Sequence, residues 1–235
     1  MILFLSLFMV SLLGGSLVFI KQDWKRFTNM ALAFSGAYLL GICLLHLIPE
    51  LFESETAEAH LGAFILIGYL LQLVLDYFSG GIEHGHVHVN KSFLGRFPWL
   101  IMISLCVHAL VEAFPLHELN NQVGISSYLM GLLLHKVPIS FILVSLLMGY
   151  KLPNYQILLA TLLFAAMGPL GVSLGQQLGH SPEMFSRLLA LSIGIILHLS
   201  TTILLESNED HRIHWKKLIP VFVGFGLAFL SLGEH

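Results

Sequence analysis

The sequence predicts an all-α membrane protein with eight transmembrane helices. Of its 235 residues, 56% are hydrophobic and only 11% are charged, whereas a soluble domain carries about 25% charged residues. The mean hydropathy is +0.84. The chain also contains eight apolar stretches, each close to the ~20 residues that a helix needs to cross a bilayer. We therefore expect a single transmembrane domain over residues 1–235.

The eight apolar stretches define the expected helices. The first could be confused with a signal peptide, but its basic residues follow it rather than precede it, so we expect a retained helix. The longest connection, residues 80–97, is too short for a soluble domain. In chain order the stretches cover roughly residues 2–20, 29–49, 61–79, 98–116, 124–148, 155–176, 187–206 and 218–233.

Basic residues between the stretches predict the orientation of the chain. They lie in the first, third, fifth and seventh connections, while the second, fourth and sixth hold only Arg187. Because basic connections stay on the cytoplasmic side, we expect the odd-numbered connections inside the cell and both termini outside. The basic residues of the odd-numbered connections are Lys21, Lys25, Arg26, Lys91, Arg96, Lys151, Arg212, Lys216 and Lys217.

Ionisable side chains inside two of the stretches indicate a function. His108 and Glu112 are four residues apart, so on a helix they project from one face, and His135 lies in the next stretch. Such groups are costly at bilayer depth and usually mark a substrate or ion path. Imidazole and carboxylate together suit a divalent transition metal, so we expect these residues to bind one. The alternative is a buried His–Glu pair that joins two helices.

The same residues do not indicate an enzyme. A zinc protease of the His-Glu-x-x-His type carries two histidines on one helix and a glutamate as general base. The stretch around His108 lacks that pattern. A metal-dependent hydrolase within the membrane is therefore the least favoured interpretation. We expect neither an organic cofactor nor a nucleic-acid partner.

Two further positions carry polar groups near or within the stretches. His46 and Glu50 repeat the four-residue spacing, and Pro49 between them tends to end or kink a helix. They form either a low-affinity metal entrance or exit, or a pair of interface residues that reach water. His198 has Thr201 and Thr202 on its face. Hydrogen bonding between helices is the favoured role for His198, and metal contact at an entrance or exit is the alternative.

The third connection contains the run GGIEHGHVHVN, in which His84, His86 and His88 alternate with other residues. Short histidine-rich tracts bind divalent metals, although weakly when the loop is flexible. We expect either such a weak cytoplasmic metal site or a plain solvated loop over about residues 80–97. Asp76, near the cytoplasmic end of the preceding helix, receives no role.

In these strings the chain resembles the ZIP family of zinc and iron transporters over nearly its full length. The shared strings are HLIPE from His46, HALVE from His108, HKVPIS from His135 and GPLG from Gly168, with the histidine-bearing loop between the first two. Their order and spacing together are specific. The resemblance implies a bundle of inverted repeats in a 3+2+3 arrangement, a midplane metal site between helices four and five, an elevator-like movement and a homodimer.

The chain departs from the family pattern at every ligand peculiar to a second metal. Many members have Asn where this chain has Ala109, and acidic residues where it has Lys136, Ile139 and Gly168. In this it is similar to a branch with His-Lys in helix five, in which the lysine ammonium replaces the second metal. The resemblance thus implies a primary set of His108, Glu112 and His135, with Lys136 as a counter-ion to Glu112.

Taken together, the residues and the resemblance predict a multi-pass transporter in the cell membrane. We expect uptake of a divalent transition metal by alternating access through a mononuclear site. Zn²⁺ is the first expected substrate, with Fe²⁺ or another divalent cation second. The alternative is a transport-inactive, metal-binding membrane sensor or scaffold. The expected partners are the metal ion, the lipid bilayer and a second copy of the chain.

Overall fold

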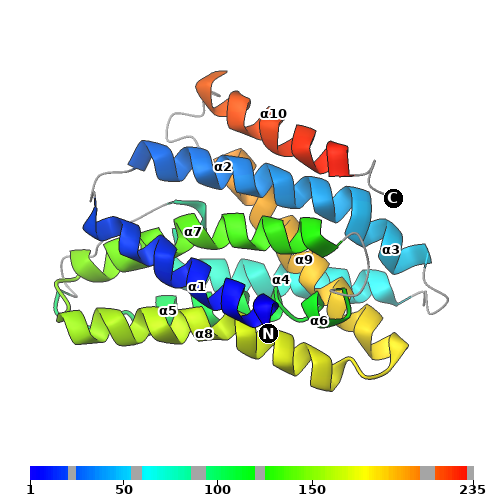
Figure 1. Ribbon diagram of the computed structural model, residues 1–235, viewed down its shortest axis with the longest axis horizontal. Helices are drawn as coiled ribbons and strands as arrows, with labels where there is room; N and C mark the ends of the chain where they lie inside the picture. Colours follow the sequence, from blue (N-terminus) through cyan, green and yellow to red (C-terminus); the bar gives the residue numbers. More distant parts are fainter. Residues whose placement is uncertain (21–24, 54–59, 86–93, 120–124, 207–214, 232–235) are drawn as a thin grey trace.

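The computed structural model describes residues 1–20, 25–53, 60–85, 94–119, 125–206 and 215–231. Over these residues the chain is helical and contains no strand (Figure 1). The α-helices are α1 (Ile2–Ser16), α2 (Lys25–Ile42), α3 (Ile48–Glu53), α4 (Leu61–Ser79), α5 (Trp99–Val111), α6 (Leu116–Leu119), α7 (Ile125–Gly149), α8 (Asn154–Leu178), α9 (Pro182–Glu206) and α10 (Trp215–Leu230). Three short helical segments are η1 (Leu17–Phe19), η2 (Cys43–Leu47) and η3 (Ile82–His84).

Within the described residues, six helical segments are long and apolar enough to cross a membrane. They coincide with the first, second, third, fifth, sixth and seventh predicted stretches, so the prediction of an all-α membrane protein is confirmed. The fourth and eighth stretches correspond to shorter apolar helices, Trp99–Val111 and Leu218–Leu230. Eight crossings therefore remain a prediction. The six long segments are Ile2–Phe19, Arg26–Glu53, Leu61–Ser79, Ser127–Gly149, Asn154–Leu178 and Pro182–Leu205.

The helices run along the long axis of the molecule and reverse direction at its ends. In Figure 1 the turn between α7 and α8 lies at the left end, and the turn between α8 and α9 lies at the right end. Helix α10 packs along α2, α4 packs along α9, and α1 packs against α7 and α8. Helix α5 packs against α4 and α8, and α7 packs against α1 and α2. His108, His135 and Lys136 on these two helices are buried.

Two of the predicted spans are interrupted. The second continues from α2 through the π-helical turn η2 into α3, and His46 lies in that turn. The fourth ends at Val111 instead of near residue 116, and a turn leads to α6. The reason is Pro115, which has no N–H to donate to the carbonyl of Val111 four residues earlier. Glu112 thus lies at the C-terminal end of α5 rather than inside a longer helix.

Residues 80–85 fold back into the bundle, which corrects the expectation of a flexible or solvated loop over this part. Gly80 and Gly81 adopt left-handed conformations, with φ of 68° and 75°, which glycine adopts at little steric cost. They end α4 and start η3, whose Glu83 and His84 are both buried. His86 and His88 lie outside the described residues.

Candidate metal centre

Buried ionisable side chains from two helices meet inside the bundle. His108 and Glu112 lie on one face of α5, as the four-residue spacing predicts, and Nε2 of His108 is 3.2 Å from Oε2 of Glu112. Helix α7 contributes His135, whose ring centroid is 6.2 Å from that of His108. It also contributes Lys136, whose Nζ is 2.5 Å from Oε1 of Glu112. Each of these four side chains is no more than 2% exposed.

The hydrogen bond from His108 to Gln72 on α4 indicates which ring nitrogen of a neutral His108 carries the proton. Nδ1 of His108 is 2.9 Å from Oε1 of Gln72, a carbonyl oxygen that can only accept, so Nδ1 carries the proton. A neutral His108 then presents the lone pair of Nε2 to Oε2 of Glu112. Neither Nε2 nor Oε2 has a hydrogen-bond partner in the described part of the chain. With His108 neutral, Nε2 and Oε2 are two buried acceptors that can bind one cation together.

A second carboxylate, that of Glu83, contacts Gln72. The side-chain N–H of Gln72 donates to Oε2 of Glu83, from the re-entrant turn η3. Oε2 of Glu83 also lies 3.8 Å from Nδ1 of His108. Glu83, Gln72 and His108 therefore form a chain from a carboxylate through an amide to an imidazole. In metal sites, such outer partners orient the ligating histidine and fix its tautomer.

Ser35 of α2 gives His135 a similar, longer contact. The hydroxyl of Ser35 donates to the carbonyl of Leu32 at 3.2 Å, and its oxygen lies 3.5 Å from Nδ1 of His135. The Ser35 oxygen can thus accept a hydrogen bond from the N–H at Nδ1, which leaves Nε2 of His135 with its lone pair. That Nε2 is buried and makes no hydrogen bond to any described residue.

Comparison with known proteins identifies the fold's relatives. The model of the family described as ZIP Zinc transporter matches residues 86–232, which is more than half of the chain. The chain belongs to the ZIP family. It is also 26% identical over 259 aligned residues to Zinc transporter YKE4 of Saccharomyces cerevisiae (strain ATCC 204508 / S288c). That alignment covers 92% of this chain and 74% of the relative.

Membership of the ZIP family confirms the resemblance and the coarse function. The protein is a multi-pass membrane protein of a metal transporter family, and ZIP family members are transporters rather than enzymes. As the side chains are placed, no group of three His, Cys, Asp or Glu residues among those described converges to hold a metal ion. His108, Glu112 and His135 are brought together, but Lys136 engages one oxygen of Glu112.

Two of the positions where this ZIP family member departs from the two-metal pattern, Ile139 and Gly168, lie near Lys136. Ala109 and Ile139 are buried, and a Cβ added to Gly168 would lie 3.5 Å from Cε of Lys136. The ammonium also lies 5.5 Å from the centroid of the Phe164 ring, within the range of a cation–π contact. Apolar surroundings and one carboxylate thus hold a lysine where other family members carry acids.

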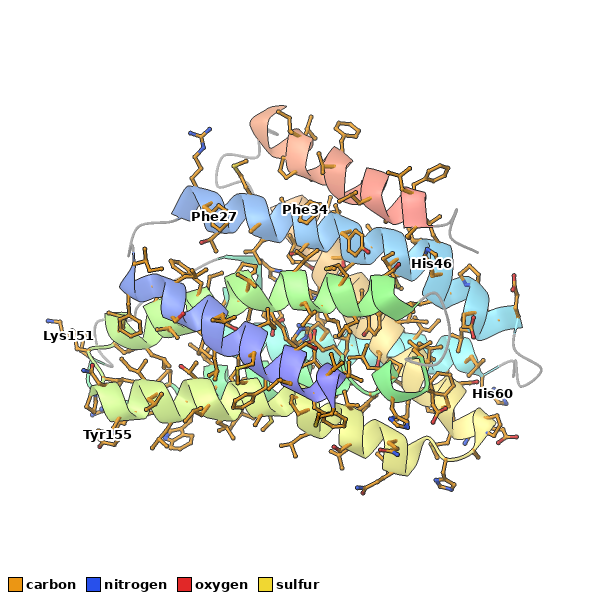
Figure 2. All side chains as sticks on the ribbon, in the orientation of Figure 1. Phe27, Phe34, His46, His60, Lys151 and Tyr155 are labelled. Atoms are coloured by element: carbon orange, nitrogen blue, oxygen red, sulfur yellow. The ribbon has the colours of Figure 1, made fainter. Side chains whose placement is uncertain are left out.

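The remaining predicted site residues lie elsewhere. His46 lies at the same end of the bundle as His60, away from Lys151 and Tyr155 (Figure 2). Its Nε2 is 3.0 Å from the hydroxyl of Ser231, and Glu50 is exposed. Neither residue joins the central cluster, so an entrance or exit role for them stays a prediction.

The loop histidine that the structure describes is close to His198. Nε2 of His84 lies 3.0 Å from Oδ1 of Asp76, and the His84 ring centroid is 6.4 Å from that of His198. The His198 ring in turn packs edge-on against Tyr69 at 4.9 Å. His198 thus contacts α4 and η3. Hydrogen bonding between helices stays the predicted role of His198, with metal contact as the alternative.

Sequence reasoning missed Gln72, Glu83, Ser35 and the pairing of Asp76. Gln72 offered a signal, because it is a lone amide within an apolar stretch and therefore needs a buried partner. Glu83 and Asp76 were visible as carboxylates near the membrane boundary. Their partners depend on the turn at Gly80 and Gly81, which brings η3 back to α4.

Proposed function

We propose that this ZIP family member takes up a divalent transition metal, Zn²⁺ first, through a mononuclear site formed by His108, Glu112 and His135. Fe²⁺ is the second candidate substrate. The yeast relative is a zinc transporter, which supports zinc as the first choice. No organic cofactor takes part.

One observation carries the proposal: Nε2 of His108 and Oε2 of Glu112 face each other at 3.2 Å, and both side chains are buried. Two acceptors at this distance repel unless a proton or a metal lies between them. Zinc binds histidine nitrogen and carboxylate oxygen at about 2.0–2.2 Å, so small side-chain movements would let both contact one ion. His135 supplies the third ligand from α7, and water completes the coordination.

Lys136 acts in this proposal as a tethered counter-ion. Its ammonium neutralises Glu112 when the carrier holds no metal, because an unpaired carboxylate in an apolar interior is strongly disfavoured. It also limits how tightly one dication binds, because metal and ammonium share the same carboxylate. A carrier has to release its substrate, and this competition favours release.

Gln72 and Glu83 support the site from behind. The chain Glu83–Gln72–His108 holds the proton of His108 on Nδ1 and directs Nε2 toward the metal. Negative charge at Glu83 makes His108 a better electron-pair donor. The two residues are therefore assigned as orienting partners rather than as ligands.

The proposal includes a location and a movement. We place the protein in the cell membrane, and the basic residues in the odd-numbered connections favour an orientation with both termini outside. Family resemblance supports an inverted 3+2+3 repeat, a homodimer and alternating access through an elevator-like movement. Helices α5 and α7, which carry all three ligands, would move together relative to their neighbours.

The second candidate function is a metal-binding sensor or scaffold that does not transport. The ion pair between Lys136 and Glu112 favours it, since a lysine fixed on the main ligand could prevent passage. The two candidates share the binding site and differ only in flux.

Zinc flux into proteoliposomes separates them. Wild-type protein should show saturable uptake, and Glu112→Gln should abolish it, with the isosteric amide preserving size. Glu118→Gln is the matched control, because Glu118 is exposed on α6. Tight zinc binding without flux in the wild type would favour the sensor, and wild-type flux in Glu112→Gln would reject the proposed site.

A further inference from the structure

The break after α5 leaves carbonyl groups without their usual helical partners. The N–H of Phe114 reaches back only to the carbonyl of Val111, at 3.2 Å, in a tighter turn than an α-helix makes. The N–H of Leu116, which would serve the carbonyl of Glu112 in a continuous helix, donates to Ala113 at 3.3 Å. Buried carbonyl groups of this kind require other donors.

Two hydroxyl groups from other helices supply these donors. The phenol of Tyr128 on α7 donates to the carbonyl of Glu112 at 2.5 Å. The hydroxyl of Ser192 on α9 donates to the carbonyl of Val111 at 2.8 Å. The carbonyl of Leu188, within the same helix as Ser192, is slightly farther from this hydroxyl, at 3.0 Å. Tyr128 and Ser192 are both fully buried. The backbone on either side of the Val111–Glu112 peptide is therefore held from outside α5.

Helix α8 closes the other side of the break. A Cβ added to Gly171 would lie 2.1 Å from the carbonyl oxygen of Leu110, and one added to Gly175 would lie 2.0 Å from that of Phe114. These separations mean that the two backbones are in direct contact, which only glycine permits. The turn that carries Glu112 thus has little freedom to shift toward α8.

The donor to Glu112 comes from the helix that also carries its side-chain partners. Tyr128 precedes His135 by seven residues, which is about two helical turns, so both project from one face of α7. Tyr128 holds the main chain of Glu112, while Lys136, one residue after His135, pairs with its carboxylate. Helix α7 therefore holds both the main-chain carbonyl and the side-chain carboxylate of Glu112.

We propose that Tyr128 is a positioning residue for metal binding, which sets the place of the Glu112 carboxylate by holding the Glu112 carbonyl. Ser192 assists it one residue earlier. The inference rests on the proposed function of Glu112 as a metal ligand. Without the phenol, the end of α5 rotates, and the Glu112 carboxylate no longer faces His108 Nε2 at the distance that a single ion requires.

Zinc titration into purified full-length protein tests this proposal. Tyr128→Phe removes only the hydroxyl, and we expect it to raise the Kd for zinc chloride about three- to tenfold, as loss of one buried hydrogen bond would. Ser192→Ala should raise it less, because Ser192 acts one residue away. Tyr150→Phe is the matched control, since Tyr150 is also buried but follows the far end of α7, and its Kd should equal that of the wild type.

A double-mutant cycle distinguishes positioning from general stabilisation. In a Glu112→Asp background the carboxylate is already displaced, so adding Tyr128→Phe should cause little further loss of affinity. Additive losses would overturn the proposal, because Tyr128 would then act independently of Glu112. A lower melting temperature with a wild-type Kd in Tyr128→Phe would overturn it as well. If Glu112→Gln binds zinc like the wild type, the proposed function itself fails; if only Tyr128→Phe does, this inference alone fails.

Discussion

The ammonium nitrogen of Lys136 lies 2.5 Å from Oε1 of Glu112, and both side chains are 2% exposed. The other oxygen of Glu112 faces Nε2 of His108 at 3.2 Å. One carboxylate therefore contacts the lysine ammonium through one oxygen and, in the proposed function, binds the substrate cation through the other.

Removing the lysine should tighten zinc binding. In Lys136→Ala the Glu112 carboxylate has no competing cation, so we expect the Kd to fall by about tenfold or more, the scale of coupling between close charge pairs. Zinc release and therefore turnover should slow. Calorimetric titration and flux on the same preparation measure the two effects. Lys151→Ala, at an exposed position, is the control, and unchanged affinity and flux in Lys136→Ala would leave Lys136 without the counter-ion role.

An acidic residue at the same position should not create a second metal site. Lys136→Asp adds one carboxylate, but Ile139 and Gly168 still lack the others that the two-metal family members use. We expect one zinc per chain in the membrane site, as in the wild type. Stoichiometry from elemental analysis of the purified variant checks this, and two bound zinc ions per site would be incompatible with it.

Breaking the hydrogen bonds that connect His108 through Gln72 to Glu83 should weaken metal binding. Gln72→Leu keeps the size of the side chain but removes both of its hydrogen bonds, to His108 and to Glu83. Loss of outer partners costs 10- to 100-fold in metal affinity in comparable sites, and we expect about that range here. Gln156→Leu, on α8 away from the cluster, should bind zinc normally. Wild-type affinity in Gln72→Leu would mean that His108 needs no orienting partner.

The histidines of the third connection should separate into two groups. His84 is buried and paired with Asp76 at 3.0 Å, so His84→Ser should lower the free energy of unfolding by about 1–3 kcal/mol, the cost of an unsatisfied buried partner. Changing His86 and His88 together to Ser should leave the maximal transport rate intact. Thermal unfolding in detergent, with the exposed His60→Ser as control, measures the first effect. Equal melting temperatures for His84→Ser and His60→Ser would show that the pair with Asp76 contributes nothing.

Local sequence patterns were sufficient for the helices and for part of the site. Apolar length predicted the long spans, because a helix that faces lipid must be apolar over its whole length. The i,i+4 spacing predicted the shared face of His108 and Glu112, since it depends only on helical geometry. The expected pairing of Lys136 with Glu112 is present, because a buried lysine ammonium needs a partner of opposite charge.

Other parts depend on contacts that the local sequence does not encode. The turn at Gly80 and Gly81 looks like the start of any loop, and only the packing of η3 against α4, α7 and α9 buries Glu83 and His84. Pro115 did signal the end of α5, but the apolar residues around it favoured a longer helix. The partners of the broken end, Tyr128 and Ser192, lie on other helices, so their role could not be recognised before the helices were assembled.

The coordination of bound zinc tests the central claim most directly. X-ray absorption of the zinc-loaded wild type should show nitrogen and oxygen ligands at about 2.0–2.2 Å, with two imidazoles, no sulfur and no second zinc near 3.5–4 Å. His108→Ala and His135→Ala should each lose one imidazole contribution, while His60→Ala should match the wild type. Unchanged imidazole scattering in either of the first two variants, or a second zinc in the wild type, would contradict a mononuclear site of His108, Glu112 and His135.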